Sequence, residues 1–459
     1  MNDNNMPSKK ETKESKYTNI DLEFKKRAWS IHGEKYDLSS FIEKHPGGTQ
    51  VLERANFMED CGVMFEIYHA FSDKERIRTQ LQNYLIPEKD LNQYNIKKPR
   101  SPIPKYDFTE HNELVKIIKE YYPNRESIKA DYFWYFKTLV LFSLFLISFY
   151  IGMFSGFSIL IKSIVSFLAG ALWIMIGFNI MHDGSHYGIS KHPKVNEILE
   201  KCWNSFGLWN SIIWHLHHVY AHHSYTGHEK LDPDVRHYQP FAAKFTGQGS
   251  ITYYYLRKIQ HITITFFATV LPGMYYGQII AYIVGAYKGK MMGTPVPKYL
   301  PIYFQWYEFV LYALSLYCLW QGLFLPTIIY TISQNIFYHF NIAPDHDTYE
   351  NNVDNKAEGT TLNWSKMQIV NSGNFNAQNL LWTHLFGGIN LQIEHHLFPN
   401  MSHVHFTRIQ PIVEDYCKKK GYPYVNHPSL WSAYKSFLKM MKYQAFQVLI
   451  GKTELEVKK

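Results

Sequence analysis

Cysteine is scarce in this sequence: there are four in 459 residues, with no Cys-x-x-Cys pair and no regular spacing. This excludes a disulfide framework and favours reduced thiols in a protein that faces the cytosol. Residues 1–19 contain no apolar run, so they do not form a signal peptide. Their mixed charges predict a disordered tail.

Charged residues make up only 19% of the chain, and lysine and arginine outnumber the acids to give a formal net charge of +8. No basic module with interleaved aromatic residues accompanies this excess, so we expect no nucleic-acid partner. We assign the positive charge to a cytosolic face against anionic lipid. Aromatic residues reach 17%, which suits membrane interfaces and grooves for acyl chains.

Histidine is abundant, and eight of the 23 histidines stand out because they form three clusters and one isolated position beside long apolar stretches. If the clusters are helical, their spacings place the imidazoles of each on one face. The clusters are His182-Asp183-Gly184-Ser185-His186, His218-Val219-Tyr220-Ala221-His222-His223 and Gln392-Ile393-Glu394-His395-His396.

Convergent imidazoles favour transition metals, and iron is the first redox candidate among them. One ion does not need eight ligands, so the pattern predicts a two-metal centre. A single His-x-x-x-His pair is more often an exposed or capping pair. Three such clusters beside apolar stretches make exposed or capping histidines an unsatisfactory explanation.

Four apolar stretches are long enough to cross a membrane, and they are 133–154, 157–180, 303–320 and 323–340. The flanks of the first pair are rich in lysine and arginine while its turn at Ser155-Gly156 has neither, so both ends of the pair face the cytosol. Residues 262–287 are also apolar. They contain Pro272-Gly273, and the third cluster must return to the cytosolic side, so we expect an interfacial or re-entrant segment and four crossings.

A small soluble unit precedes the apolar stretches. Residues 29–37 predict two strands joined by a glycine turn. His45-Pro46-Gly47-Gly48 then predicts a sharp turn from which the imidazole projects, although such a turn can be purely structural. His69 follows 24 residues later as a second candidate.

The three clusters, in this order and setting, resemble the histidine boxes of the membrane fatty acid desaturase family. Gln392 at the start of the third box resembles the front-end branch, whose members carry a fused cytochrome b5 domain. Residues 20–87 resemble that domain, and His45 and His69 match its two axial haem ligands. The stretch 56–64 departs from the usual cytochrome b5 sequence motif. The departure concerns the conformation of a loop and not the two haem ligands.

The resemblance implies a site in which imidazoles of all three boxes bind two irons. It also implies that His339, at the end of the last apolar stretch, is a ligand, and that Asn335 holds a metal-bound water. Without the resemblance, His339 reads as an interfacial histidine. Gln392 is expected to coordinate or hydrogen-bond, and three acids to orient the imidazoles. The expected ligands are His182, His186, His218, His222, His223, His339, Gln392, His395 and His396, and the orienting acids are Asp183, Asp232 and Asp234.

The expected fold is therefore multidomain. A small α+β cytochrome b5-like haem domain precedes an all-α integral membrane desaturase domain with four transmembrane helices and a cytosolic cap that carries the His boxes. The expected divisions are a disordered tail (1–19), the haem domain (20–87), a linker with an interfacial helix (88–130), the desaturase domain (131–442) and a C-terminal tail (443–459).

The resemblance implies a front-end acyl desaturase that places a cis double bond between an existing one and the carboxyl end of a polyunsaturated chain. Its cofactors would be haem b and two irons, with O2 as co-substrate and electrons from NADH through cytochrome b5 reductase. The substrate would be a fatty acyl lipid or acyl-CoA. The location would be the endoplasmic reticulum, with both termini and the metal site cytosolic.

Several alternatives remain open at this stage. The residues of the boxes resemble delta-5 members more than delta-6 members. Delta-6 fatty acid and sphingolipid long-chain-base delta-8 desaturases nevertheless share the same boxes. Hydroxylases and acetylenases use the same oxidant. From other classes, a membrane-anchored haem electron carrier or a zinc-dependent membrane hydrolase is conceivable. A zinc site needs only three or four ligands and no haem.

Overall fold

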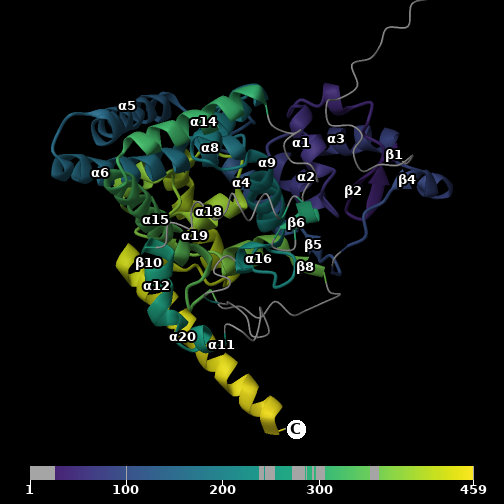
Figure 1. Cartoon of the computed structure of the whole chain (residues 1–459). Coiled ribbons are helices and arrows are strands. Elements are labelled where there is room, and N and C mark those ends of the chain that lie inside the picture. Colours follow the sequence, from purple (N-terminus) through teal and green to yellow (C-terminus); the bar gives the residue numbers. More distant parts are fainter. Residues whose placement is uncertain are drawn as a thin grey trace, which may run out of the picture.

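The computed structural model describes residues 26–99, 101–236, 254–270, 305–351 and 361–457, with a few isolated residues between 242 and 295. The expected tail 1–19 lies outside the described residues. The described chain is mostly helical, and the N-terminal part, purple in Figure 1, lies at one side of the central helices. The apolar hairpin of α5 (Tyr132–Phe154) and α6 (Ile159–Ile176) lies at the opposite side.

The N-terminal part combines short strands with three helices. Strands β2 (Trp29–Ile31) and β3 (Glu34–Tyr36) pair antiparallel through a turn in which Gly33 has a φ of 84°. Strand β1 (Lys26–Arg27) pairs with β4 (Tyr94–Asn95), so strand pairing continues beyond the expected boundary at residue 87. The helices are α1 (Thr49–Ala55), α2 (Gly62–Tyr68) and α3 (Lys74–Leu81). Trp29 and Ile67 are buried in their shared core.

A linker and one helix lead from this part to the apolar hairpin. Strand β5 (Lys105–Asp107) pairs with β8 (Thr361–Asn363), far along the chain. Helix α4 (Thr109–Lys119) buries Leu114 and Ile118 against the same core. A helix is therefore present within the expected linker 88–130, and it packs against protein on its apolar face.

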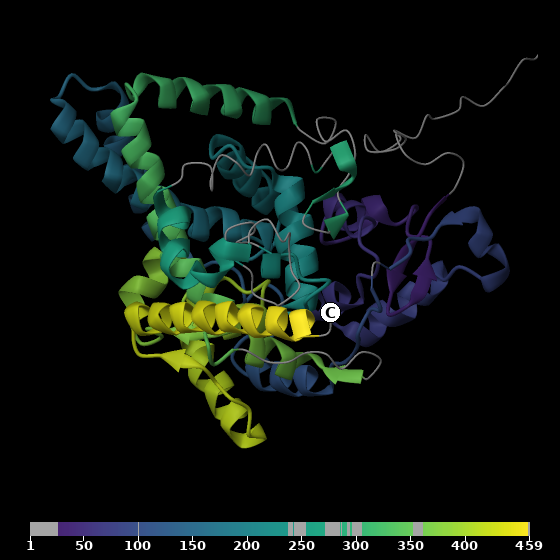
Figure 2. The same cartoon turned by 60° about the horizontal axis from the view of Figure 1, so that its bottom comes forward.

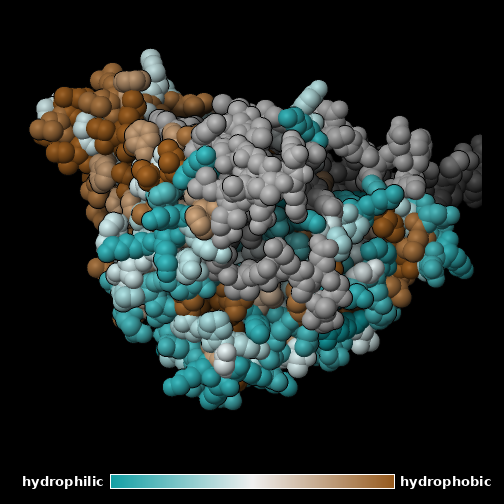
Figure 3. Space-filling model, turned by 90° about the horizontal axis from the view of Figure 1, so that it is seen from below, coloured by the Kyte–Doolittle hydropathy of each residue, from teal (hydrophilic) through white to brown (hydrophobic). Residues whose placement is uncertain are grey.

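Helices α5 (Tyr132–Phe154) and α6 (Ile159–Ile176) are apolar and antiparallel neighbours. Of the described helices, the stretches 132–154 and 159–185 are each long and apolar enough to cross a membrane. Their outer side chains, such as Leu146, Tyr150, Leu160 and Ile164, are exposed. Figure 3 shows apolar side chains, in brown, gathered at one end of the molecule. Such a surface is stable only in contact with lipid or another apolar surface.

The chain bends by 119° between helices α14 (Trp306–Gln321) and α15 (Leu325–His346). Figure 2 shows the corner where α14 turns into α15. Counted as one bent span, the pair brings the number of candidate spans in the described residues to three. The expected four crossings therefore stay a prediction.

The segment expected to be interfacial, 262–287, is described only to residue 270 apart from isolated positions. Helix α12 (Gln260–Val270) covers that beginning and follows α11 (Tyr254–Lys258). Gln260 Nε2 donates a hydrogen bond of 2.9 Å to the Met441 carbonyl, so this helix lies against the C-terminal helix. Farther on, β6 (Lys290–Met291) pairs with β7 (Thr294–Pro295).

The first two His boxes lie on π-helical turns at Gly177–His182 and His215–His222, which are followed by α7 (Asp183–Ser185) and α10 (His223–Tyr225). Helices α8 (Pro193–Phe206) and α9 (Ser211–Trp214) connect the two boxes. A π-helical turn inserts an extra residue and shifts the side chains around the axis, and such turns are frequent at functional sites.

The C-terminal region surrounds the boxes with α16 (Trp364–Asn371), α17 (Leu380–Leu385), α18 (Gln392–Leu397), α19 (Phe406–Lys420) and α20 (Leu430–Val457). A short parallel pair, β9 (Asn374–Phe375) with β10 (Asn426–His427), ties α16 to the start of α20. Helix α20 extends to Val457, so the segment expected to form the C-terminal tail (443–459) is helical as far as the structure describes it.

Candidate metal centre and a second histidine pair

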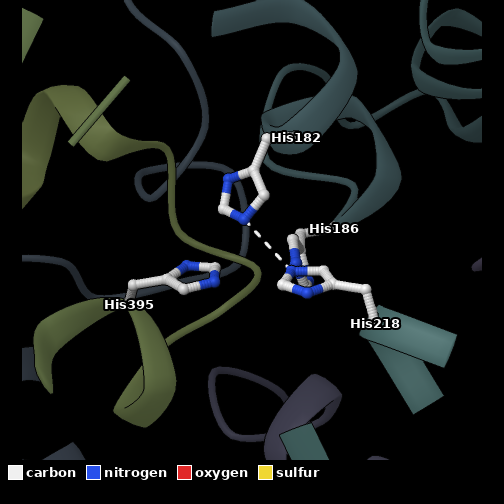
Figure 4. A group of neighbouring side chains, drawn as sticks. All are labelled: His182, His186, His218 and His395. Carbon is white, nitrogen blue, oxygen red and sulfur yellow. Dashed lines mark hydrogen bonds between the residues drawn. The ribbon is translucent and has the colours of Figure 1, made fainter. Parts of the chain in front are cut away.

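The first group of converging imidazoles comes from all three boxes. His182, His186, His218 and His395 each offer a ring nitrogen, and these nitrogens lie within 4.8 Å of one another. Figure 4 shows the four rings turned towards a common centre from three different segments. His182 Nε2 and His218 Nε2 are 3.2 Å apart. All four side chains are buried.

The second group contains one histidine that the sequence analysis did not select. His222, His346 and His396 also bring their nitrogens within 4.8 Å of one another. His222 Nε2 is 3.2 Å from His346 Nε2. The Gln392 amide nitrogen lies 2.9 Å from His346 Nε2 and 3.2 Å from His396 Nε2. A half-turn of this amide would present its oxygen to the same position.

His223 joins the two groups. Its Nε2 is 3.1 Å from His395 Nε2, and His223, His395 and His396 form a third set with nitrogens within 4.8 Å. The two groups are therefore parts of one buried cluster. The structure brings all seven box histidines and Gln392 into this cluster.

Hydrogen bonds at Nδ1 fix the orientation of four of the rings. In each case Nδ1–H donates to an oxygen and leaves Nε2 to face the cluster. The distances are 3.0 Å from His222 to Asp232, 2.9 Å from His396 to Gln368, 2.8 Å from His346 to the Asn371 carbonyl and 3.0 Å from His186 to the Tyr68 hydroxyl.

The electrostatics of the cluster keep its rings neutral. Burial holds the pKa of five imidazoles well below the ordinary value of 6.5, and the repulsion between neighbouring imidazoles lowers it further. The five are His186, His218, His223, His395 and His396. His186 Nε2 is buried without a hydrogen-bond partner. Neutral imidazoles whose Nε2 lone pairs face one another form a donor set that suits a transition-metal cation.

The expectation that His339 joins the metal ligands is not met in the structure. His339 Nε2 lies 3.0 Å from the Tyr434 hydroxyl, and its ring packs against Phe437. It belongs to none of the converging groups found among the described residues. Asn335, one turn earlier, is 3.5 Å from the Thr269 carbonyl and faces α12.

The physical reason is the length of α15. The sequence analysis ended this helix at residue 340, but it continues to His346 and includes Pro344. His346 follows His339 by seven residues, which is two turns along the same face and about 10 Å farther along the axis. The longer helix therefore brings His346 to the cluster and leaves His339 beside α20. The same-face spacing from His339 was the signal that could have identified His346.

The three acids of the sequence analysis lie close to the cluster in different ways. Asp232 accepts from His222 Nδ1–H, as described above. Asp234 contacts His217 Nε2, and its other oxygen is 3.4 Å from His222 Nδ1. Asp183 accepts from His403 Nδ1–H at 2.8 Å and from Trp134 Nε1–H at 3.1 Å. Asp183 thus holds the segment after the third box against the first box and does not touch a box imidazole directly.

A separate histidine pair lines a cavity in the N-terminal part. The rings of His45 and His69 are 6.2 Å apart between centroids and perpendicular. His45 Nδ1–H donates to the Gly48 carbonyl at 3.2 Å, and His69 Nδ1–H donates to the Phe65 carbonyl at 2.8 Å. Both rings line a cavity of about 310 Å³, a size typical of ligand sites. Burial lowers the pKa of His45 to about 4 and lowers that of His69, so both rings are neutral at pH 7.

The glycines of His45-Pro46-Gly47-Gly48 are required by this arrangement. Gly48 has a φ of 95°, which L side chains rarely adopt. A Cβ on Gly47 would lie 2.6 Å from Cε1 of His45. Any larger residue at position 47 would therefore push the imidazole out of its place.

Comparison with known proteins adds to this geometry. Residues 157–428 match the family described as fatty acid desaturase, and this range includes all three boxes and His346. The chain belongs to the fatty acid desaturase family. It is an oxidoreductase, and the apolar surface of α5 and α6 identifies it as a membrane protein.

The desaturase is also similar over most of its length to curated acyl-lipid desaturases. It is 27% identical to the acyl-lipid (8-3)-desaturase of Physcomitrium patens, over 90% of this chain and 87% of that one. It is 24% identical to the acyl-lipid (8-3)-desaturase of Mortierella alpina, over 90% and 92%. It is 26% identical to the chloroplastic acyl-lipid (7-3)-desaturase of Chlamydomonas reinhardtii, over 89% and 79%.

Proposed function

We propose that this desaturase is a front-end enzyme that inserts a cis double bond into the acyl chain of a lipid between an existing double bond and the carboxyl end. The observation that carries the proposal is the buried cluster, in which the seven box histidines, His346 and Gln392 converge. The similarity to acyl-lipid desaturases supports an acyl-lipid substrate. The substrate position is proposed as delta-5, with delta-6 and sphingolipid delta-8 as the competing positions.

The cluster fits two iron ions. His182, His186, His218 and His395 would hold one, and His222, His346 and His396 the other, with His223 between them and Gln392 beside the second. When bound, iron supplies the O2-dependent oxidation that no side chain can perform. The chain itself orients the ligands through Asp232, Gln368 and Tyr68. Burial of every box imidazole keeps bulk water away from the oxidation.

The N-terminal part supports the proposal of a fused cytochrome b5 domain. His45 and His69 present neutral Nε2 atoms across the cavity, which suits a haem with two axial imidazoles and no open position for O2. The linker residues Arg125 and Lys129 line the same cavity and could pair with the haem propionates. The proposed role of this haem is to carry single electrons from NADH through cytochrome b5 reductase to the metal centre.

An apolar cavity of about 30 Å³ lies beside the first box. Its lining includes Phe178, Met181, Trp209 and Tyr338, and Met181 directly precedes the ligand His182. We propose that this cavity is part of the acyl-chain path, since an apolar lining next to the cluster would hold methylene groups without offering them hydrogen bonds.

The experiment that tests the function is expression in a host that lacks polyunsaturated lipids, with defined fatty acids supplied. The positions of new double bonds are read by mass spectrometry. A new bond on the carboxyl side of an existing one is the expected product. A bond on the methyl side, a hydroxyl group or no change would contradict the proposal, and no change together with an intact haem band would favour the electron carrier.

We expect Gln392→Ile to lower desaturation by about 10- to 100-fold, the usual effect of losing an outer ligand. Isoleucine has a similar size, but it offers nothing to the second metal position beside His346 and His396. Gln392→His is the matched variant, because it returns a nitrogen ligand and should retain measurable desaturation. Product formation per unit of expressed protein is the measurement, and wild-type activity in Gln392→Ile would show that the amide only fills space.

The proposed topology has four crossings in the endoplasmic reticulum membrane, with both termini and the metal centre cytosolic. Glycosylation acceptors inserted near Lys290 and Asn351 should therefore remain unmodified. An acceptor in an extended turn at Ser155-Gly156, between α5 and α6, should be modified and serves as the positive control. Gel mobility before and after deglycosylation reports the result, and modification at Lys290 or Asn351 would refute the four-crossing arrangement.

A further inference from the structure

Tyr68 lies between the two histidine sites. It is the last residue of α2 and directly precedes His69, and its side chain lines the same cavity as His45. Its hydroxyl is 3.0 Å from Nδ1 of His186, a member of the first metal group. Its carbonyl accepts a hydrogen bond of 3.3 Å from Asn400 Nδ2, which follows the third box. Residues of the metal-centre region therefore hydrogen-bond to both the backbone and the side chain of Tyr68.

The direction of the bond to His186 follows from the cluster. His186 Nε2 is buried, has no hydrogen-bond partner and lies with the nitrogens of His182, His218 and His395. A neutral imidazole that uses Nε2 as a ligand carries its proton on Nδ1. Nδ1–H of His186 therefore donates to the Tyr68 oxygen.

We propose that Tyr68 is a positioning residue that couples the haem site to the metal centre, by orienting His186 and by linking it through one hydrogen bond to the chain at His69. The inference rests on the proposed function, because it requires haem at His45 and His69 and iron at the cluster. It assigns a role to a residue outside the three boxes and outside the haem ligands.

The proposed coupling is the transfer of the electrons that the reaction requires, from the haem to the metal centre. Each transfer moves one electron: ferrous haem iron is oxidised to ferric, and the metal centre gains that electron. Two transfers, two protons from water and two hydrogens from the acyl chain reduce one O2 to two waters. The route from His69 to His186 consists of one peptide unit, the Tyr68 side chain and a 3.0 Å hydrogen bond. Consecutive Cα atoms are only about 3.8 Å apart, so the covalent part of this route is short.

A tyrosine away from both histidine sites offers a matched control. Tyr416 in α19 is buried and donates a hydrogen bond of 3.2 Å to the Glu110 carbonyl in α4. Tyr68→Phe and Tyr416→Phe each remove one hydroxyl and preserve the ring. Only Tyr68→Phe removes a hydrogen bond to a metal-site imidazole.

The test uses the purified full-length chain loaded with haem and iron. Haem absorbance and non-haem iron content are measured first. The haem is then reduced with dithionite and mixed rapidly with O2 and an acyl lipid whose polyunsaturated chain has its first double bond at carbon 8. Haem oxidation is followed by its absorbance. An iron-free sample gives the background rate of direct oxidation by O2, which is subtracted.

For Tyr68→Phe we expect an unchanged haem band, iron content within about twofold of wild type and haem oxidation slowed by about 10-fold or more per iron-loaded centre, the size typical for loss of a group that supports a ligand. Tyr416→Phe should oxidise at the wild-type rate. If Tyr68→Phe oxidises as fast as wild type per loaded centre, the inference is refuted, and a loss of iron alone would assign Tyr68 to ligand support only. A wild-type chain without a haem band or without iron-dependent oxidation would instead refute the proposed function.

Discussion

Replacing His346 with alanine is expected to abolish desaturation, with a loss of more than about 100-fold, because a direct ligand is removed and the loss of a supporting group already costs about 10- to 100-fold. His346 Nε2 is within 3.2 Å of both His222 Nε2 and the Gln392 amide. Alanine leaves the second metal position with His222 and His396 as its remaining imidazoles. Product formation and iron per chain are the measurements, and iron content should fall by about half.

His339→Ala is the matched control on the same helix. Its ring contacts Tyr434 and Phe437 and not the cluster, so alanine removes packing at α20 and should cost about 1–3 kcal/mol of stability, as typical core losses do. Activity per folded molecule should stay within about threefold of wild type. An inactive, iron-poor His339→Ala beside an active His346→Ala would show that the ligands of the second position are assigned wrongly.

Replacing His45 or His69 with alanine is expected to remove the haem absorbance and with it all desaturation driven by NADH. Each ring is held by a backbone carbonyl at Nδ1 and presents Nε2 to the cavity, so either loss leaves haem with one axial imidazole. A haem held by one side chain is retained poorly. The absorbance of the purified chain and product formation are the measurements.

The non-haem iron of these two variants separates haem loss from misfolding. The cluster lies outside the haem cavity, so iron content should remain close to that of wild type. His32→Ala provides a control within the same part of the chain, because this imidazole contacts Glu66 at the surface and not the cavity. A His69→Ala chain that keeps full haem absorbance and activity would show that the axial pair is assigned wrongly.

The convergence of the box histidines could be predicted from sequence because short-range spacing places them on common faces, and the apolar stretches place those faces at one side of a membrane. Even so, the assumed α-helical geometry was incomplete. π-helical turns at His182 and at His218–His222 send His218 to the first group and His222 to the second. Glu394, two residues after Gln392, points away from the cluster and accepts hydrogen bonds from Tyr424 and Asn374.

The spacing of His346 from His339 was the one signal for His346 in the sequence, but its position at the cluster is set by packing. Pro344 and the polar residues after position 340 favour a helix end, and proline usually disrupts a helix interior. In the folded chain α15 lies between α6, α12 and α20, and this tertiary packing carries the helix through the proline to its end at His346. The bend between α14 and α15 is likewise a tertiary feature, and hydropathy alone reads the pair as two straight spans.

The most direct test of the account is the metal and haem content of the purified full-length chain, measured by elemental analysis together with the pyridine-haem spectrum. The account predicts two non-haem irons and one haem b per chain, with the haem oxidised in an iron-dependent reaction with O2 and acyl lipid. Zinc in place of non-haem iron, or a chain that desaturates without haem, would contradict it.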